Sequence, residues 1–129
     1  MEINIGMTAT VTDIVTEQNT AATVGSGSLR VFATPMMVAL MEKAACEAVE
    51  SGLDVGSTTV GTLVNVEHLS ATPLGMAVNV TATVTAVEGR KICFLVEASD
   101  EAGLIGKGTH ERFVVFTEKF MAKTESKGK

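Results

Sequence analysis

Residues 34–52, TPMMVALMEKAACEAVESG, form the only long stretch of the chain with a convincing helix pattern. Pro35 suits the first helical position, so we expect Thr34 as the N-cap and Gly52 in the left-handed conformation that ends a helix. This helix is apolar almost all round, except for a narrow polar stripe of Lys43, Glu47 and Glu50. A helix of this kind has to be wrapped by other elements, most simply by a curved sheet.

The segments on either side of the helix have the composition and alternation of strands. One strand is expected before the helix, over residues 7–17, and four follow it, over residues 58–69, 76–87, 91–99 and 104–117. A flexible loop centred on residues 24–28 leads into the helix. One helix followed by a run of strands predicts the α+β class, with an antiparallel sheet packed on a single helix. Gly106 and Gly108 indicate a bulge or a close approach of two backbones.

The composition narrows the class of protein. The 129 residues fit one domain, which we place at residues 1–118, followed by a polar, frayed tail over residues 119–129. A net charge of −5 argues against a nucleic-acid binder. Cys46 and Cys93 lie in apolar runs without metal-ligand spacing, so we expect two buried free thiols and a reducing compartment.

Targeting and cofactor signals are missing from the sequence as well. No apolar stretch reaches the roughly 18 residues that a membrane span needs, and the start of the chain has no signal-peptide pattern. We therefore expect a cytoplasmic protein that does not bind a membrane. The sequence carries no redox-cofactor motif and no metal site, so we expect neither kind of group.

Two polar residues interrupt apolar faces. Glu42 lies off the polar stripe of the helix, and a carboxylate on an apolar face is costly unless it is paired or hydrogen-bonded. It is therefore a candidate for catalysis, or else a rim residue, or the partner of an arginine across an interface. His68 lies on a half-apolar strand face and is either functional or a hydrogen-bonded structural residue. His110 is a weaker candidate, for a ligand or dimer contact or a solvated edge.

Several separated blocks resemble the fluoroacetyl-CoA thioesterase and its relatives in the hotdog superfamily. The resemblance covers about residues 32–123, and its most specific parts are the GTHER block at residues 108–112 and the spacing of Thr34, Glu42 and His68. The matching blocks are VFAT at residues 31–34, Met37 and Val38, LME at residues 40–42, Ala45 and Cys46, His68, ATP at residues 71–73, Gly75, VEGR at residues 87–90, Gly106, GTHER and EKF at residues 118–120.

The resemblance implies a hotdog fold, a homodimer with active sites at or near the dimer interface, and hydrolysis of an acyl-CoA. The two subunits could assemble further into a tetramer. Thr34, Glu42 and His68 are then the catalytic residues, with coenzyme A entering only as part of the substrate. By the same match, Gly61 lies near the thioester carbonyl and Arg112 helps to shape the site. Phe32, in the first matched block, is expected to contact the substrate.

The chain departs from the fluoroacetyl-specific enzyme in one segment. That enzyme has an aromatic-rich lid before the VFAT-like block, whereas residues 20–30 here read TAATVGSGSLR and contain no aromatic side chain. We therefore expect a short-chain or small aryl acyl-CoA as substrate rather than fluoroacetyl-CoA. The alternatives are a non-catalytic acyl-CoA-binding protein and a hotdog dehydratase or hydratase that acts on acyl thioesters.

Overall fold

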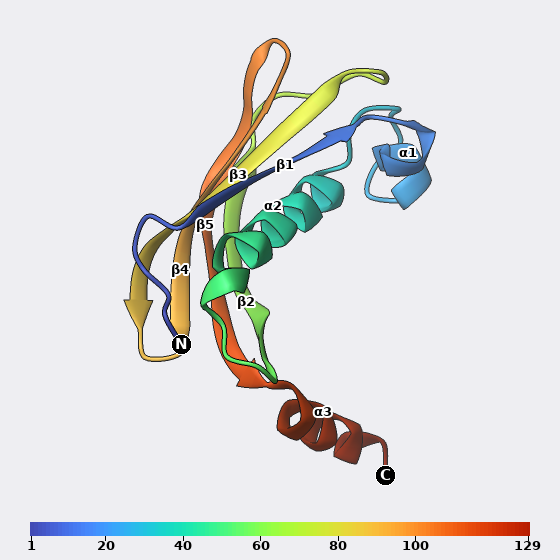
Figure 1. The fold of residues 1–129 in the computed structure, drawn as a ribbon. Coiled ribbons are helices and arrows are strands. Elements are labelled where there is room, and N and C mark those ends of the chain that lie inside the picture. The colour runs from blue at the N-terminus through green and yellow to red at the C-terminus, as the bar shows by residue number, and fades with distance from the viewer.

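The computed structural model describes all 129 residues and confirms the α+β class. Five antiparallel strands form one curved sheet in the order β1-β3-β4-β5-β2, with the long helix α2 on its concave side (Figure 1). The strands are β1 (Thr8–Ile14), β2 (Ser57–His68), β3 (Ala77–Glu88), β4 (Lys91–Asp100) and β5 (Gly103–Phe116). The helices are α1 (Ala21–Val24), α2 (Thr34–Val49) and α3 (Thr117–Glu125), with single 3-10 turns at Glu17–Asn19, Glu50–Gly52 and Ser126–Gly128.

The ends of α2 differ from the expectation by small but informative shifts. Ala33 occupies the N-cap position and Thr34 is the first helical residue, so the prediction that Thr34 caps the helix is wrong. Its hydroxyl is instead bonded to a histidine side chain, which leaves it available for chemistry. Gly52 is not left-handed. A side chain at Gly52 would put a Cβ 2.3 Å from the backbone oxygen of Glu2, so the glycine is needed for close packing.

The last residues form a helix, so the expectation of a frayed tail is also wrong. Helix α3 begins directly after β5 and projects beyond one end of the sheet, away from α1 (Figure 1). Glu118 lies in its first turn and Lys123 in its last turn, and both charges are favourable to the helix dipole there. Polarity alone indicated fraying because it overlooked these helix-stabilising positions.

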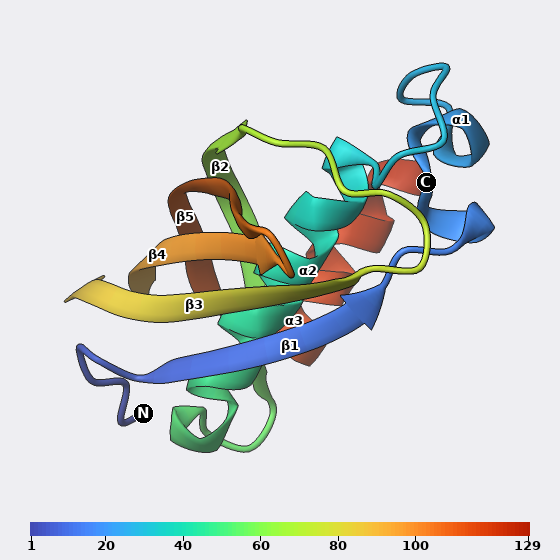
Figure 2. The same cartoon turned by 90° about the horizontal axis from the view of Figure 1, so that it is seen from above.

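The core lies between α2 and the concave face of the sheet. Met37, Met41 and Ala45 of α2 are fully buried, as are Val78 and Val80, two of the alternating apolar residues of β3. Helix α2 packs mainly against β1 and β3 and much less against β4 and β2, as the view from above shows (Figure 2). The concave face of β2 is therefore only partly covered.

Other expectations about the chain have mixed outcomes. Cys46 and Cys93 are free, as predicted, but they are half-buried rather than buried. None of the helices combines the length and the apolar character that a membrane crossing requires. No group of three or more histidine, cysteine, aspartate or glutamate side chains is arranged to hold a metal ion.

Gly108 confirms the expected close approach of two backbones. A Cβ at this position would lie 2.1 Å from the Asn65 backbone oxygen and 2.6 Å from Val66 Cα, both on the neighbouring strand β2. Because these are backbone atoms, they cannot move aside without shifting the strand.

We predict that Gly108→Ala lowers the free energy of unfolding by about 1–3 kcal/mol, the usual cost of overpacking. Thr109→Ala, at the neighbouring exposed position of the same strand, is the control and should have little effect. Urea unfolding of both variants measures the difference. Equal stability of the two variants would show that the strands separate there without cost.

Candidate functional site

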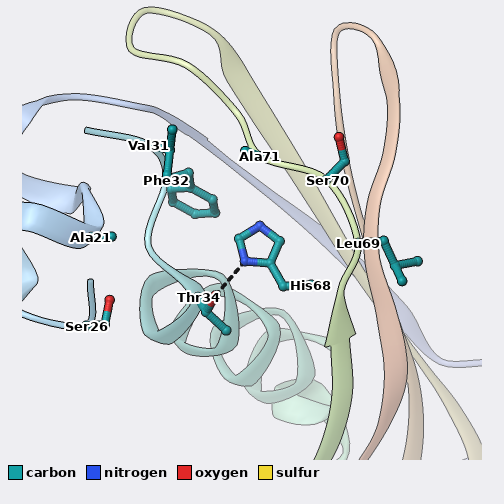
Figure 3. A pocket seen from close by; sticks show the side chains of 9 residues that line it. All are labelled: Ala21, Ser26, Val31, Phe32, Thr34, His68, Leu69, Ser70 and Ala71. Atoms are coloured by element: carbon teal, nitrogen blue, oxygen red, sulfur yellow. Dashed lines mark hydrogen bonds between the residues drawn. The ribbon is translucent and has the colours of Figure 1, made fainter. Parts of the chain in front are cut away.

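Thr34 and His68 meet at a cavity near the N-terminal end of α2. The Thr34 hydroxyl and His68 Nδ1 are 2.7 Å apart, although the residues lie 34 positions apart in the sequence. The cavity has a volume of about 230 Å³, and Figure 3 shows the two side chains facing each other within it. The residues that line it are Ala21, Ser26, Val31, Phe32, Thr34, His68, Leu69, Ser70 and Ala71.

The His68 ring is held from two sides and has one nitrogen free. Phe32 packs edge-on against the imidazole with ring centroids 6.4 Å apart, while Thr34 holds Nδ1. Nε2 is buried and has no hydrogen-bond partner. Burial lowers the pKa of His68, and the nearby Ser70 backbone offsets only part of this effect. A neutral imidazole with an unpaired buried nitrogen is suited to exchange a proton with a bound molecule.

A second polar group surrounds Arg112, whose side chain is only 7% exposed. Its Nε donates to Thr59 Oγ1 at 2.8 Å and its Nη2 donates to the Thr59 backbone oxygen at 3.0 Å. Its Nη1 donates to Glu42 Oε2 at 3.3 Å, and this carboxylate side chain is 41% exposed. Strand β2 and helix α2 are thus connected through one guanidinium on β5. Of the alternatives left open for Glu42, an arginine partner is therefore present, but within the same chain.

His110 completes the arrangement around Arg112. Its Nε2 lies 3.2 Å from Arg112 Nη1, and because a guanidinium can only donate, Nε2 must be the acceptor. The proton is then on Nδ1, which donates to the Leu63 backbone oxygen at 2.7 Å. The ring also stacks on Phe94 and is 1% exposed. Burial is the main cause that lowers the pKa of His110, and the nearby Arg112 charge adds to it.

Gly61 lies against the carboxylate of Glu42. A Cβ at this position would be 2.6 Å from Glu42 Oε2 and 3.2 Å from Arg112 Nη1, so any side chain would displace the carboxylate or the guanidinium. Strand β2 is irregular immediately after Gly61, where its register with β5 shifts. Gly61, Arg112 and Glu42 are thus brought together, whereas Phe32 belongs to the cavity of Thr34 and His68.

The structure of one chain therefore contains two groups rather than one site. Thr34 and Glu42 lie eight residues apart on α2, which corresponds to about 12 Å along the helix axis. No printed contact links the Thr34–His68 pair to Glu42 within one chain.

Thr59 is the site residue that the sequence analysis did not single out. It is a buried threonine among several exposed ones, and only its pairing position opposite β5 places it at Arg112. The sequence has no local signal for this contact because its two partners are 53 residues apart.

We predict that stability rises with pH up to about 6.5. Both histidines have a folded pKa below the unfolded value of about 6.5, so between these values the unfolded chain binds more protons. Acidification through this interval therefore destabilises the fold. Urea unfolding at about pH 5.5 and about pH 7.5 measures the change.

His110→Gln is the matched variant, because its amide oxygen can replace the Nε2 acceptor but cannot titrate. It should show a shallower pH dependence than the wild type below about pH 6.5. A wild-type stability that is unchanged or greater at the lower pH would contradict the assignment of neutral histidines.

Comparison with known proteins places this geometry in a family. Residues 15–118 match the family model described as fluoroacetyl-CoA-specific thioesterase. The fluoroacetyl-CoA thioesterase of Streptantibioticus cattleyicolor is 47% identical over 97 residues, which cover 75% of this chain and 70% of that protein. The solved structure of the fluoroacetyl-CoA thioesterase FlK has a TM-score of 0.91 at 38% identity and covers 98% of each chain.

A more distant relative has the same fold. A Thermus thermophilus hypothetical protein, described as a thioesterase superfamily member, has a TM-score of 0.89 at 31% identity over 97% of this chain and 93% of its own. Fold, sequence and family model all agree with the resemblance inferred from the short motifs. The chain therefore belongs to the fluoroacetyl-CoA-specific thioesterase family, a family of thioester hydrolases with a hotdog-like fold.

Proposed function

We propose that the protein hydrolyses a short-chain or small aryl acyl-CoA to the free acid and CoA, using Thr34, Glu42 and His68. The observation that carries this proposal is the unpaired, buried Nε2 of His68 in a cavity, on a ring that Thr34 holds in place. The Streptantibioticus relative is named as an acyl-CoA thioesterase, and FlK has been solved with fluoroacetate and CoA. Both names support an acyl-CoA as the substrate.

A dimer would bring the two groups of site residues together. Strand β2 is an edge strand, and its concave face carries Gly61 and Val64, with Val64 40% exposed because α2 leaves this part of the sheet open. An unpaired edge beside an open apolar face favours a partner. In a two-fold contact along β2, the two α2 helices run in opposite directions. The Thr34 end of one helix then approaches Glu42 of the other.

The proposed reaction assigns one role to each residue. Glu42 either attacks the thioester carbonyl directly, forming an anhydride that water then cleaves, or takes a proton from the water that attacks. The carbon–sulfur bond breaks in both routes, and the CoA thiolate takes up a proton. His68, neutral near pH 7 because its pKa is lowered, can accept and return that proton. Thr34 orients the His68 ring through Nδ1.

The developing oxyanion needs hydrogen-bond donors. Backbone N–H groups near Gly61 or at the N-terminus of α2 are the candidates, since Gly61 lies beside Glu42 and α2 begins at the cavity with Thr34. Arg112 holds the Glu42 carboxylate in place rather than reacting itself.

The cavity lining supports a small acyl group. Its volume is about 230 Å³, and Phe32 is the single phenylalanine in a lining otherwise made of small or aliphatic residues and the two polar site residues. Helix α1 contributes Ala21 to this lining, from the segment that lacks aromatic residues. A selective fit to the fluoroacetyl group is therefore not expected from the wall that α1 provides.

We predict that Glu42→Gln lowers kcat for acyl-CoA hydrolysis at least about a hundredfold, because it removes the nucleophile or general base. Glu47→Gln, on the exposed stripe of the same helix, is the control and should keep wild-type activity. Release of free CoA from acetyl, fluoroacetyl, branched and benzoyl thioesters measures the rates. Full activity of Glu42→Gln would exclude the proposed chemistry.

The same panel separates the other functional classes. Tight binding of acyl-CoA without any hydrolysis would indicate a binding protein, and hydration of a crotonyl thioester would indicate a hydratase. Either result with the wild-type protein contradicts the proposed thioesterase activity.

Mixed dimers test whether the site uses two chains. His68→Ala and Glu42→Gln should each be inactive alone. If the site is shared, half of the mixed population is heterodimeric and each heterodimer has one intact site, so co-folding should restore about a quarter of wild-type activity. No recovery, with heterodimers verified by mass spectrometry, would place all three residues in one chain's site.

A further inference from the structure

Three phenylalanines and three cations surround one cavity beside α3. The chain has five phenylalanines, and Phe32 and Phe94 are buried, whereas Phe113, Phe116 and Phe120 are 37–54% exposed. All three exposed rings line a cavity of about 250 Å³ together with Arg90, Lys119 and Lys123. No carboxylate lines it, although the chain as a whole carries a net charge of −5.

The fold brings these side chains together from two segments. Arg90 lies in the turn between β3 and β4, and its guanidinium carbon is 5.5 Å from the centre of the Phe113 ring. The Arg90 backbone oxygen accepts a hydrogen bond from Val114 N–H at 2.8 Å, which ties the turn to β5. Lys119 and Lys123 lie one helical turn apart on α3, so both can face the same cavity.

None of the three cations is neutralised within the chain. The ion pairs of the structure join Arg30 to Glu17, Lys91 to Glu88, Arg112 to Glu42 and the amino terminus to Asp54. Like charges at i and i+4 on a helix repel each other, so Lys119 and Lys123 do not stabilise α3 together. Exposed rings and unpaired cations around one cavity indicate a ligand that is both flat and anionic.

We propose that this cavity binds the 3′-phosphorylated adenosine diphosphate end of coenzyme A. The inference rests on the proposed thioesterase function and names the subsite for the non-reacting end of its substrate. An adenine ring stacks well on aromatic faces. Arginine and lysine bind the phosphate groups through charge-assisted hydrogen bonds.

The cavity lies within reach of the reacting groups along one strand. Arg112, which holds Glu42, is followed directly by Phe113 on β5, and the neighbouring side chains point to opposite faces of the sheet. From Arg112 to Phe116 the strand rises by about 13 Å. The ligand would pass around the end of the sheet, where α3 begins, and the flexible pantetheine arm of CoA can span this path.

Substrates with and without the nucleotide test the proposal. The double variant Lys119→Gln/Lys123→Gln should raise KM for acetyl-CoA at least about tenfold, since two charge-assisted contacts are lost. Its KM for acetyl-pantetheine, which lacks the nucleotide, and its kcat for both substrates should stay unchanged. Lys107→Gln, at a lysine that lines a different cavity, is the control. Circular dichroism verifies that α3 remains folded.

Competition supplies a second measurement. Adenosine 3′,5′-bisphosphate should inhibit hydrolysis of acetyl-CoA by the wild type competitively and should bind less tightly to the double variant. An equal rise of KM for acetyl-CoA and acetyl-pantetheine, or no rise for either, would overturn the subsite.

The failure of this proposal and the failure of the proposed function give different results. If the wild type hydrolyses neither thioester, the thioesterase proposal fails. Calorimetry with adenosine 3′,5′-bisphosphate then tests the cavity alone: weaker binding by the double variant than by Lys107→Gln supports it, and no binding by the wild type overturns it.

Discussion

The buried guanidinium of Arg112 links the sheet to the helix at the candidate site. A buried cation has to be compensated, and here Thr59, His110 and Glu42 accept its hydrogen bonds from three sides. Removing one partner of a buried ion pair usually costs about 3–5 kcal/mol, and the partial exposure of Glu42 reduces that cost by solvent screening. The same contacts fix the carboxylate beside Gly61, so one interaction serves both the fold and the site.

This constraint explains why the polar residues are divided into two groups. His110 must stay neutral to accept from Arg112, and its burial ensures this by lowering its pKa. His68 is neutral for the same reason, but its Nε2 faces no protein partner. One histidine therefore completes a structural network, while the other keeps an unused nitrogen. Edge strand β2 and the open face beside it provide the place where a second chain could join the two groups.

The sequence predicted the elements better than the contacts. The alternation of β3 and the apolar helix indicated the α+β class, and Gly108 indicated the close approach of strands, because periodicity and small residues are local signals. The Thr34 cap was misplaced by one residue, since Pro35 fits the second helical position as well as the first. The helix at residues 117–125 was missed because its residues are polar. The contact of Thr59 with Arg112 depends on strand register, which no short motif specifies.

The most direct test is a crystal structure of the protein with a thioether analogue of acetyl-CoA that cannot be hydrolysed. The account predicts a dimer in which the acetyl carbonyl lies within hydrogen-bond distance of His68 Nε2 of one protomer and beside the partner's Glu42. It also predicts the adenosine end at Arg90, Lys119 and Lys123. An analogue bound away from His68 and from both Glu42 carboxylates would contradict the proposed site.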